Sequence, residues 1–331
     1  MVPPLQNDVR RRALAAPSRA AGLLPHEWLC GGLLLFLWLR VVSAGGFLDR
    51  DGLSLLLILL LNILMLAVCT RRQSDRYWRS RLLFYALAMN LLYFLLGSAV
   101  PKIHPAMADE ALQAVDQWLI GTHAAFYLER WVHPVVTEIF SFCYLWYLVY
   151  LFSSQIEYLS GDIEDAKAFY TGMFSIYAIG YLGYATVPAL GPYLAMAEEF
   201  QVPLEGGWFT HITAQIVNSA SNHVDIFPSL HVANSLYILL FDYRHKRCRF
   251  WLYLLPCTSL VIATLYLRYH YVIDVLSGIV LSLAALWLAH RLSTAEDNKK
   301  EINIRVALKQ KRAHHRSVRR HRLRAGKAVR V

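Results

Sequence analysis

The sequence predicts an all-α polytopic membrane protein with about eight transmembrane helices. Apolar residues make up 56% of the 331 residues and charged residues 17%, whereas soluble domains are about 45–50% apolar and about 25% charged. The mean hydropathy is positive, at +0.36. The apolar residues are gathered into long runs that short charged clusters separate, which indicates repeated membrane crossings. These observations exclude a typical cytosolic enzyme and a small disulfide-stabilised domain.

Eight apolar segments have roughly the 20-residue length that a helix needs to cross the hydrocarbon of a bilayer. They cover residues 28–47, 52–70, 82–100, 134–153, 169–190, 226–243, 250–267 and 271–290. The first segment carries Arg40, which we expect either to extend to the membrane surface or to face a partner helix. The first seven residues of the sixth segment are its least apolar, so we expect its outer end to lie at the membrane surface.

The distribution of Lys and Arg predicts the orientation. With a cytoplasmic N-terminus, 28 of the 33 Lys and Arg residues lie on the cytoplasmic side and four on the other side, as the positive-inside rule requires. The basic residues before the first segment resemble the start of a signal peptide, but the long apolar run after them favours a retained anchor. We expect both termini in the cytoplasm, a bacterial plasma membrane as the location, and extracytoplasmic pieces at 48–51, 101–133, 191–225 and 268–270.

Composition divides the chain into three parts. Residues 1–80 are expected to form a cytoplasmic N-terminus with an added transmembrane hairpin, residues 81–290 a membrane-embedded catalytic core, and residues 291–331 a basic tail with 14 Lys and Arg. Because the tail has little apolar periodicity, we expect it to be disordered and to rest on anionic lipid, with no nucleic-acid partner. The cysteines form no CxxC pair and are interpreted as buried free thiols: Cys30, Cys69, Cys143, Cys248 and Cys257.

Residues 111–121 are expected to form a helix that lies in the membrane interface. Their apolar residues recur at helical spacing, and Trp118 is typical of an interfacial aromatic belt. We interpret the role of this helix as architectural.

The first polar cluster, Phe-Pro-Ser-Leu-His at residues 227–231, lies where the sixth apolar segment resumes. Proline suits the first helical turn, so we expect Pro228 there. A helix start presents unpaired N–H groups and the positive end of a dipole, which favour an anion such as phosphate. Ser229 adds a hydroxyl donor, and His231 lies within the first turn. The cluster therefore predicts an anion site with an imidazole beside it.

The second cluster contains Arg268, His270 and Asp274, at the outer end of the last segment. His270 and Asp274 are four residues apart, so on a helix they share one face. A carboxylate there accepts the proton of one imidazole nitrogen and leaves the lone pair of the other nitrogen available as a nucleophile or base. Arg268 adds a fixed positive charge that suits phosphate oxygens.

The helical hairpin at residues 232–269 brings the two clusters together. Ionisable residues at the membrane edge are costly and usually functional, so we interpret His231, His270 and Asp274 as catalytic. Metal binding by these side chains is less favoured, because their spacing matches no familiar ligand pattern and Arg268 would repel a cation. A transporter's proton relay is a remote alternative, since no inverted repeat or pair of broken helices is evident.

The pair of motifs at residues 227–231 and 270–274 resembles the type 2 phosphatidic acid phosphatase superfamily. This family includes lipid-phosphate phosphatases and inositol phosphorylceramide synthases. The resemblance covers about residues 85–290. It implies an all-helical core of six helices, with a site that faces away from the cytoplasm and needs neither metal nor cofactor.

The resemblance also implies a role for each residue. His270 would attack phosphorus and form a phosphohistidine, while Asp274 orients its ring. His231 would protonate the leaving oxygen and later activate the acceptor. Ser229 would bind the transferred phosphoryl group. Two imidazoles used in this way divide phosphoryl transfer into two steps.

The sequence departs from the phosphatase branch in two places. That branch has Ser-Arg where Ala263 and Thr264 stand here, and Lys102 is followed seven residues later by Asp109 instead of arginine. Residues 188–193, Pro-Ala-Leu-Gly-Pro-Tyr, look similar to a proline-rich element of the inositol phosphorylceramide synthase branch. Without the family's arginine, phosphate contacts are expected from Arg268, Tyr193, Lys102 and backbone N–H groups.

The resemblance leaves two activities open. The leading prediction is a metal-independent lipid-phosphate phosphatase, in which water accepts the phosphoryl group. The alternative is an inositol phosphorylceramide synthase-like transferase, in which a lipid alcohol accepts a phospho-headgroup. Both use the same covalent intermediate, so the acceptor distinguishes them.

Overall fold

The computed structural model describes residues 22–70 and 74–293, and every regular element within them is a helix. The basic N-terminal residues and almost all of the tail, with its expected lipid contacts, lie outside the described residues. In chain order the helices are α2 (Pro25–Gly45), α3 (Arg50–Cys69), α4 (Asp75–Ile103), α5 (Asp109–Ile120), α6 (Ala124–Glu129), α7 (Pro134–Ser160), α8 (Ile163–Thr186), α9 (Pro192–Ala195), η1 (Ala197–Glu199), α10 (Trp208–Ala220), α11 (Leu230–His245), α12 (Arg247–Tyr266) and a final helix, Val272–Ser293.

Six of these helices are long and apolar enough to cross a membrane: α2, α3, α4, α7, α12 and the final helix. The other two expected segments form helices α8 and α11, which do not meet both criteria. Helix α11 has only 16 residues because it begins at Leu230. Helix α8 is buried along most of its length and carries small and polar residues, as suits a helix that faces protein. The difference from the eight expected spans therefore lies in the two central helices.

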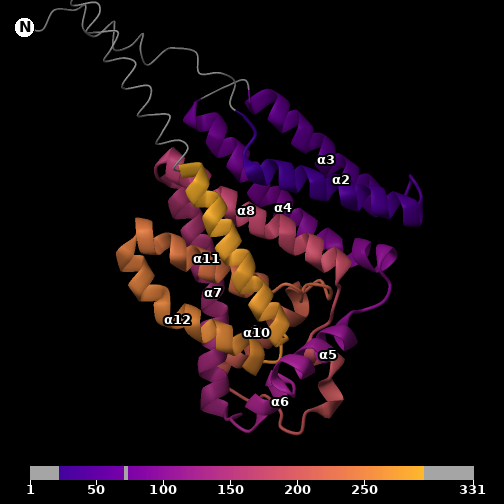
Figure 1. Cartoon of the computed structure of the whole chain (residues 1–331), viewed down its shortest axis with the longest axis vertical. Coiled ribbons are helices and arrows are strands. Elements are labelled where there is room, and N and C mark those ends of the chain that lie inside the picture. Colours follow the sequence, from indigo (N-terminus) through magenta and orange to yellow (C-terminus); the bar gives the residue numbers. More distant parts are fainter. Residues whose placement is uncertain (1–21, 71–73, 294–331) are drawn as a thin grey trace, which may run out of the picture.

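The N-terminal hairpin, α2 and α3, packs on α4 and α8 (Figure 1). In this interface Arg81 Nε donates to Glu27 Oε1 at 2.9 Å, and both side chains are almost fully buried. Arg40 donates to the carbonyl of Ile103 at 3.1 Å, so it faces a partner helix. The expected boundary between residues 80 and 81 lies inside α4. The first turns of α4 thus belong to the same interface as the hairpin.

A buried carboxylate joins the helices that carry the site. Asp242 in α11 is fully buried and accepts hydrogen bonds from Tyr150 at 2.8 Å, Tyr158 at 2.7 Å and Arg249 Nε at 2.6 Å. A buried charge is tolerated only when it is paired and hydrogen-bonded. These contacts therefore fix α7, α11 and α12 to one another at the end of the bundle remote from the histidines.

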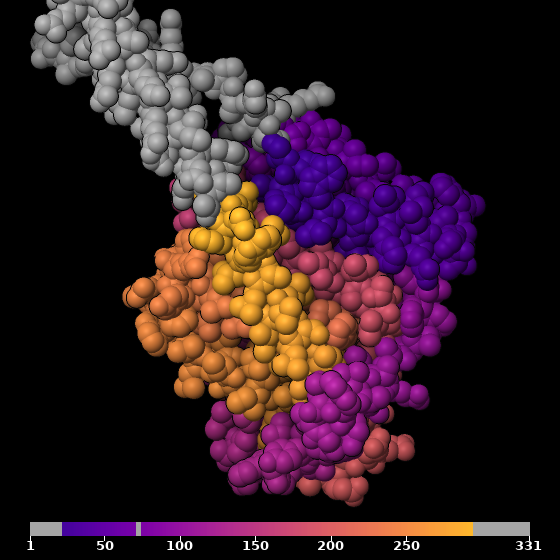
Figure 2. Space-filling view, in the orientation of Figure 1, coloured from indigo at the N-terminus to yellow at the C-terminus, as the bar shows by residue number. Residues whose placement is uncertain are grey.

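The loops that join successive long helices lie alternately at the two ends of the bundle, in the predicted order. At one end Arg79 donates to the carbonyl of Gly161 at 2.7 Å, and Arg249 pairs with Glu157. At the other end α5, α6 and the loops around α9 form a layer across the helix ends (Figures 1 and 2). Both histidine motifs begin at this second end, so the alternation of crossings brings them to one face.

Candidate active site

The first motif forms the start of α11. Ser229 is the N-cap residue, and its buried hydroxyl accepts from the N–H of Val232 at 3.4 Å. Pro228 precedes this cap instead of lying in the first helical turn, and the Phe227–Pro228 peptide bond is cis. His231 lies in the first turn, as predicted. The hydroxyl hydrogen of Ser229 remains available to a ligand at this helix start.

The second motif spans the start of the final helix. His270 precedes that helix by two residues, so His270 and Asp274 do not share a helix face, contrary to the prediction. Asp274 instead turns back from the first helical turn. Its Oδ2 accepts the N–H of Tyr271 at 2.8 Å and lies 3.4 Å from His270 Nδ1. This arrangement is half of a capping box, and it brings the two side chains close together by a different route, although His270 Nδ1 makes no hydrogen bond at this distance.

The His270 imidazole is almost fully buried, at 3% exposure. Burial lowers the pKa of His270 to about 4, although the carboxylate of Asp225 and a hydrogen bond to the backbone of Ile226 act in the opposite direction. Asp225 itself accepts from Tyr93 at 2.5 Å and from Ser221 at 2.8 Å. The ring of His270 is therefore neutral at pH 7, which a nitrogen nucleophile requires.

The structure brings the two histidines together. The ring centroids of His231 and His270 are 5.9 Å apart. The N–H of Ser229 donates to the carbonyl of Asp274 at 3.1 Å. A Cβ at Gly278 would lie 2.6 Å from the Ser229 carbonyl oxygen, so only glycine permits this approach. The starts of α11 and the final helix are thereby fixed relative to each other.

Tyr144 of α7 makes a contact with His231 that the motifs did not predict. Its hydroxyl lies 3.1 Å from His231 Nε2, and its ring lies 4.9 Å from the rings of His231 and Tyr269. Tyr147 packs on His231 at 5.0 Å. The available signal was the recurrence of tyrosine at positions 144, 147 and 150 in an otherwise apolar segment. Tyr144 and Tyr147 of α7 therefore form an aromatic wall that orients His231.

Tyr193 lies in the short helix α9 and Arg268 in the loop that follows α12, both near the site. The N–H of Tyr193 donates to the Arg268 carbonyl at 2.7 Å, and the ring centroids of Tyr193 and Tyr269 are 5.4 Å apart. The Arg268 guanidinium donates to the Val202 carbonyl at 2.6 Å and lies 3.3 Å from Glu129, while its Nε is buried without a partner. Tyr193 therefore borders the site through Tyr269. Nη2 of Arg268 is held by protein, and its Nε makes no hydrogen bond within the protein.

Lys102 is held at the N-terminal hairpin. Its Nζ lies 2.6 Å from Asp49 and 2.8 Å from Asp51. Lys102 in turn lowers the pKa of Asp49 by hydrogen bonding to its carboxylate. Because two carboxylates already neutralise this ammonium group, the expectation that Lys102 binds phosphate finds no support in its contacts.

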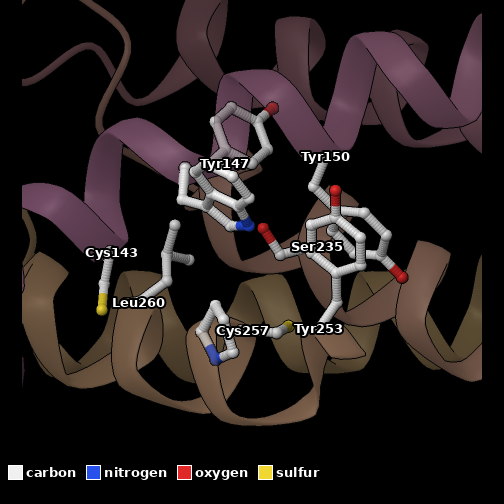
Figure 3. A pocket seen from close by; sticks show the side chains of 9 residues that line it. Cys143, Tyr147, Tyr150, Ser235, Tyr253, Cys257 and Leu260 are labelled. Atoms are coloured by element: carbon white, nitrogen blue, oxygen red, sulfur yellow. The ribbon is translucent and has the colours of Figure 1, made fainter. Parts of the chain in front are cut away.

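A small pocket adjoins the aromatic wall between α7, α11 and α12 (Figure 3). Tyr147, Tyr150, Ser235, Tyr253 and Cys257 are among the residues that line it. It encloses about 10 Å³, which is roughly the space that one water molecule occupies. Tyr147 links this pocket to His231, but in this conformation the pocket is too small for an acyl chain.

Comparison with known proteins gives two matches. A sequence profile of the PAP2 superfamily matches residues 110–288, more than half of the chain. The chain is also similar to a PA-phosphatase related-family protein of Dictyostelium discoideum, with 28% identity over 127 residues. That match covers 37% of this chain and 23% of the relative, so the chain spans about a quarter of the relative's length. No solved structure matches the chain significantly.

Proposed function

The chain belongs to the PAP2 superfamily, and from this premise we propose that it is a membrane enzyme that transfers a phosphoryl group from a lipid phosphate through a phosphohistidine. One observation carries the proposal. His270 and His231 come from segments about forty residues apart and lie 5.9 Å apart, with Asp274 beside His270 at 3.4 Å. The proposed nucleophile, its orienting carboxylate and a second acid/base therefore lie together where the starts of α11 and the final helix meet.

In the proposed reaction a nitrogen of His270 attacks phosphorus, and the bond from phosphorus to the lipid oxygen breaks. His231, which has to be in its protonated form for this step, gives a proton to that oxygen and becomes neutral. Asp274 stabilises the positive charge that develops on the imidazole of His270. Water, deprotonated by His231, then attacks the phosphohistidine, which releases phosphate and restores His270. Catalysis of this kind depends on positioning and on charge stabilisation.

The two converging helix starts differ in what they offer a phosphoryl group. In the final helix the N–H groups of residues 271, 272 and 273 are already bonded to the carboxylates of Asp274 and Asp116. In α11 the Ser229 hydroxyl caps Val232 and retains its own hydrogen. The start of α11 is therefore the proposed phosphoryl site, with Tyr193 at its border and Arg268 Nε as an additional donor.

One observation favours the transferase alternative. Thr264, at the position of the phosphatase branch's arginine, is fully buried, and its carbonyl accepts the N–H groups of Tyr269 and His270. No cation thus occupies that position beside the nucleophile. An inositol phosphorylceramide synthase-like transferase, whose acceptor is a lipid alcohol, therefore remains the second candidate.

The deciding experiment uses purified protein in detergent with EDTA. Phosphatidic acid, isoprenyl pyrophosphate, or phosphatidylinositol with a lipid alcohol is offered, and free phosphate and new lipids are measured together. We expect free phosphate from the wild type and none from His270→Ala. A new phospholipid without free phosphate would assign the transferase. Activity that EDTA removes and a divalent cation restores would contradict a metal-independent reaction, and no product from any lipid would favour a transporter.

The orientation of the protein in its membrane gives a separate prediction. All five cysteines are free, four are buried, and Cys248 is exposed at the end remote from the histidines. We propose that the histidine end faces away from the cytoplasm, as the distribution of Lys and Arg predicts. A membrane-impermeant maleimide should then label Glu205→Cys, made in a Cys248→Ser background, on intact cells. Native Cys248 should react only after the cells are opened, and the reverse pattern would invert the orientation.

A further inference from the structure

Helix α5 buries its two aspartates and exposes most of its apolar residues. Asp109, Leu112 and Asp116 form its buried stripe, at 6%, 5% and 1% exposure. Trp118 is 82% exposed and Ile120 46%. A lipid-facing apolar surface explains the outer side of this helix, but buried carboxylates are costly unless hydrogen bonds compensate for lost hydration. The two aspartates therefore indicate a specific role on the inner side.

Asp116 binds the start of the final helix. Its Oδ2 accepts the N–H of Val272 at 2.8 Å, and its Oδ1 accepts the N–H of Ile273 at 3.0 Å. These are the first two N–H groups of that helix, which have no partner within the helix. The residue immediately before them is Tyr271, whose N–H bonds to Asp274. Asp116 thus fixes, from a distant element, the backbone that carries both Asp274 and His270.

Asp109 binds the proline-rich loop and the same short segment. Its carboxylate accepts from the N–H groups of Leu190 and Gly191, each at 2.9 Å, and from the Tyr271 hydroxyl at 2.9 Å. Gly191 has a φ of +80°, and a Cβ there would lie 2.6 Å from the Tyr269 carbonyl oxygen. Asp109 therefore holds the proline-rich loop against the residue that precedes His270.

We propose that Asp116 and Asp109 are positioning residues for His270, a role that rests on the proposed function. The two carboxylates bind backbone or side-chain groups at residues 271, 272 and 273 on one side of His270, and the loop packed on Tyr269 on the other. Helix α5 lies against the start of the final helix (Figure 2). Helix α5 thereby sets the distance between His270 and Asp274, in addition to its contact with lipid.

Asp116→Ala and Asp116→Asn test the proposal, with Glu138→Ala as the matched control. Glu138 also binds the start of a distant helix, since it accepts the N–H groups of Gly207, Phe209 and Thr210 at α10. Asp116→Ala should lower kcat by about 100-fold, the cost of displacing a reacting group by roughly 1 Å. KM should change little because Asp116 does not touch the lipid. Asp116→Asn keeps one acceptor oxygen, so its kcat should lie between those of the wild type and Asp116→Ala.

A second measurement does not depend on turnover. Diethyl pyrocarbonate modifies accessible imidazoles, and peptide mass spectrometry measures its rate at His270. We expect faster modification of the buried His270 in Asp116→Ala and an unchanged rate in Glu138→Ala. Equal kcat values for the Asp116→Ala and Glu138→Ala variants, or an unchanged rate at His270 in Asp116→Ala, would overturn the positioning role. A wild type that turns over no lipid would reject the proposed function, and the modification rates would still decide the role of Asp116.

Discussion

Replacement of His270 by alanine is expected to lower kcat by at least about 1,000-fold, because alanine has no nitrogen with which to form the covalent intermediate. Within the site, His270 lies beside the Asp274 carboxylate and is buried in its neutral form. The loss should appear in kcat and in kcat/KM alike, because binding of the substrate's lipid part does not depend on this ring and KM should stay unchanged. The measurement is phosphate release or lipid product formation from saturating substrate, with the melting temperature of each variant as the test of folding.

The matched control is His245→Ala. His245 lies at the opposite end of the bundle, where its Nε2 is 3.8 Å from Asp165, so the chain contains a second histidine–aspartate pair outside the site. His245→Ala should retain most of the wild-type rate. Retention of more than a few per cent of that rate by a folded His270→Ala variant would exclude His270 as the nucleophile.

Asp274→Asn is expected to preserve the fold and to lower kcat by about 1,000- to 10,000-fold, the scale that a wrong imidazole tautomer produces in a comparable triad. Asp274 Oδ2 accepts the N–H of Tyr271 and also faces His270 Nδ1. An asparagine oxygen at this position keeps the cap of the final helix but carries no negative charge, so it favours the proton on Nδ1 less strongly. A larger share of His270 then carries its proton on the other ring nitrogen, which removes the lone pair needed for attack.

Asp165→Asn is the control for this substitution, because it alters the other histidine–aspartate pair in the same way. We expect it to change neither the rate nor the melting temperature measurably. The tautomer of His270 can be read directly from the nitrogen chemical shifts of a protein labelled at histidine. Unchanged kinetics in Asp274→Asn, together with an unchanged tautomer, would remove the orienting role from Asp274.

The architecture followed from the sequence because membrane-spanning helices are specified locally. A bilayer offers no hydrogen bonds to the backbone, so a long apolar run has to form a helix. All eight expected segments are helices, and residues 111–121 lie almost entirely within α5. Six of them are long and apolar enough to cross a membrane, whereas α8 and α11 do not meet both conditions. Helix α11 is short, and α8 carries small and polar residues and is covered by its neighbours.

The site was only partly predictable for a related reason. His231 and His270 each stand in a compact local motif, so the sequence pointed to both. The role of Lys102 could not be judged from spacing, because its partners Asp49 and Asp51 lie in a different hairpin. Asp116 carried a weak signal, because it lies four residues after Leu112 and so on the same face of the helix. Which face of α5 is buried against the protein depends on the elements that pack on the helix.

The sequence by itself determined the helical membrane fold, the two histidine motifs and the end of the bundle at which they meet. Each of these rests on local composition and on the alternation of crossings. Only the tertiary structure decided how the site is held: Tyr144 on His231, Asp274 turned back to Tyr271, and Asp116 at the start of the final helix. Hydrogen bonds between residues more than a hundred positions apart, such as that of Asp116 to Val272, depend on packing of distant elements, which local patterns do not encode.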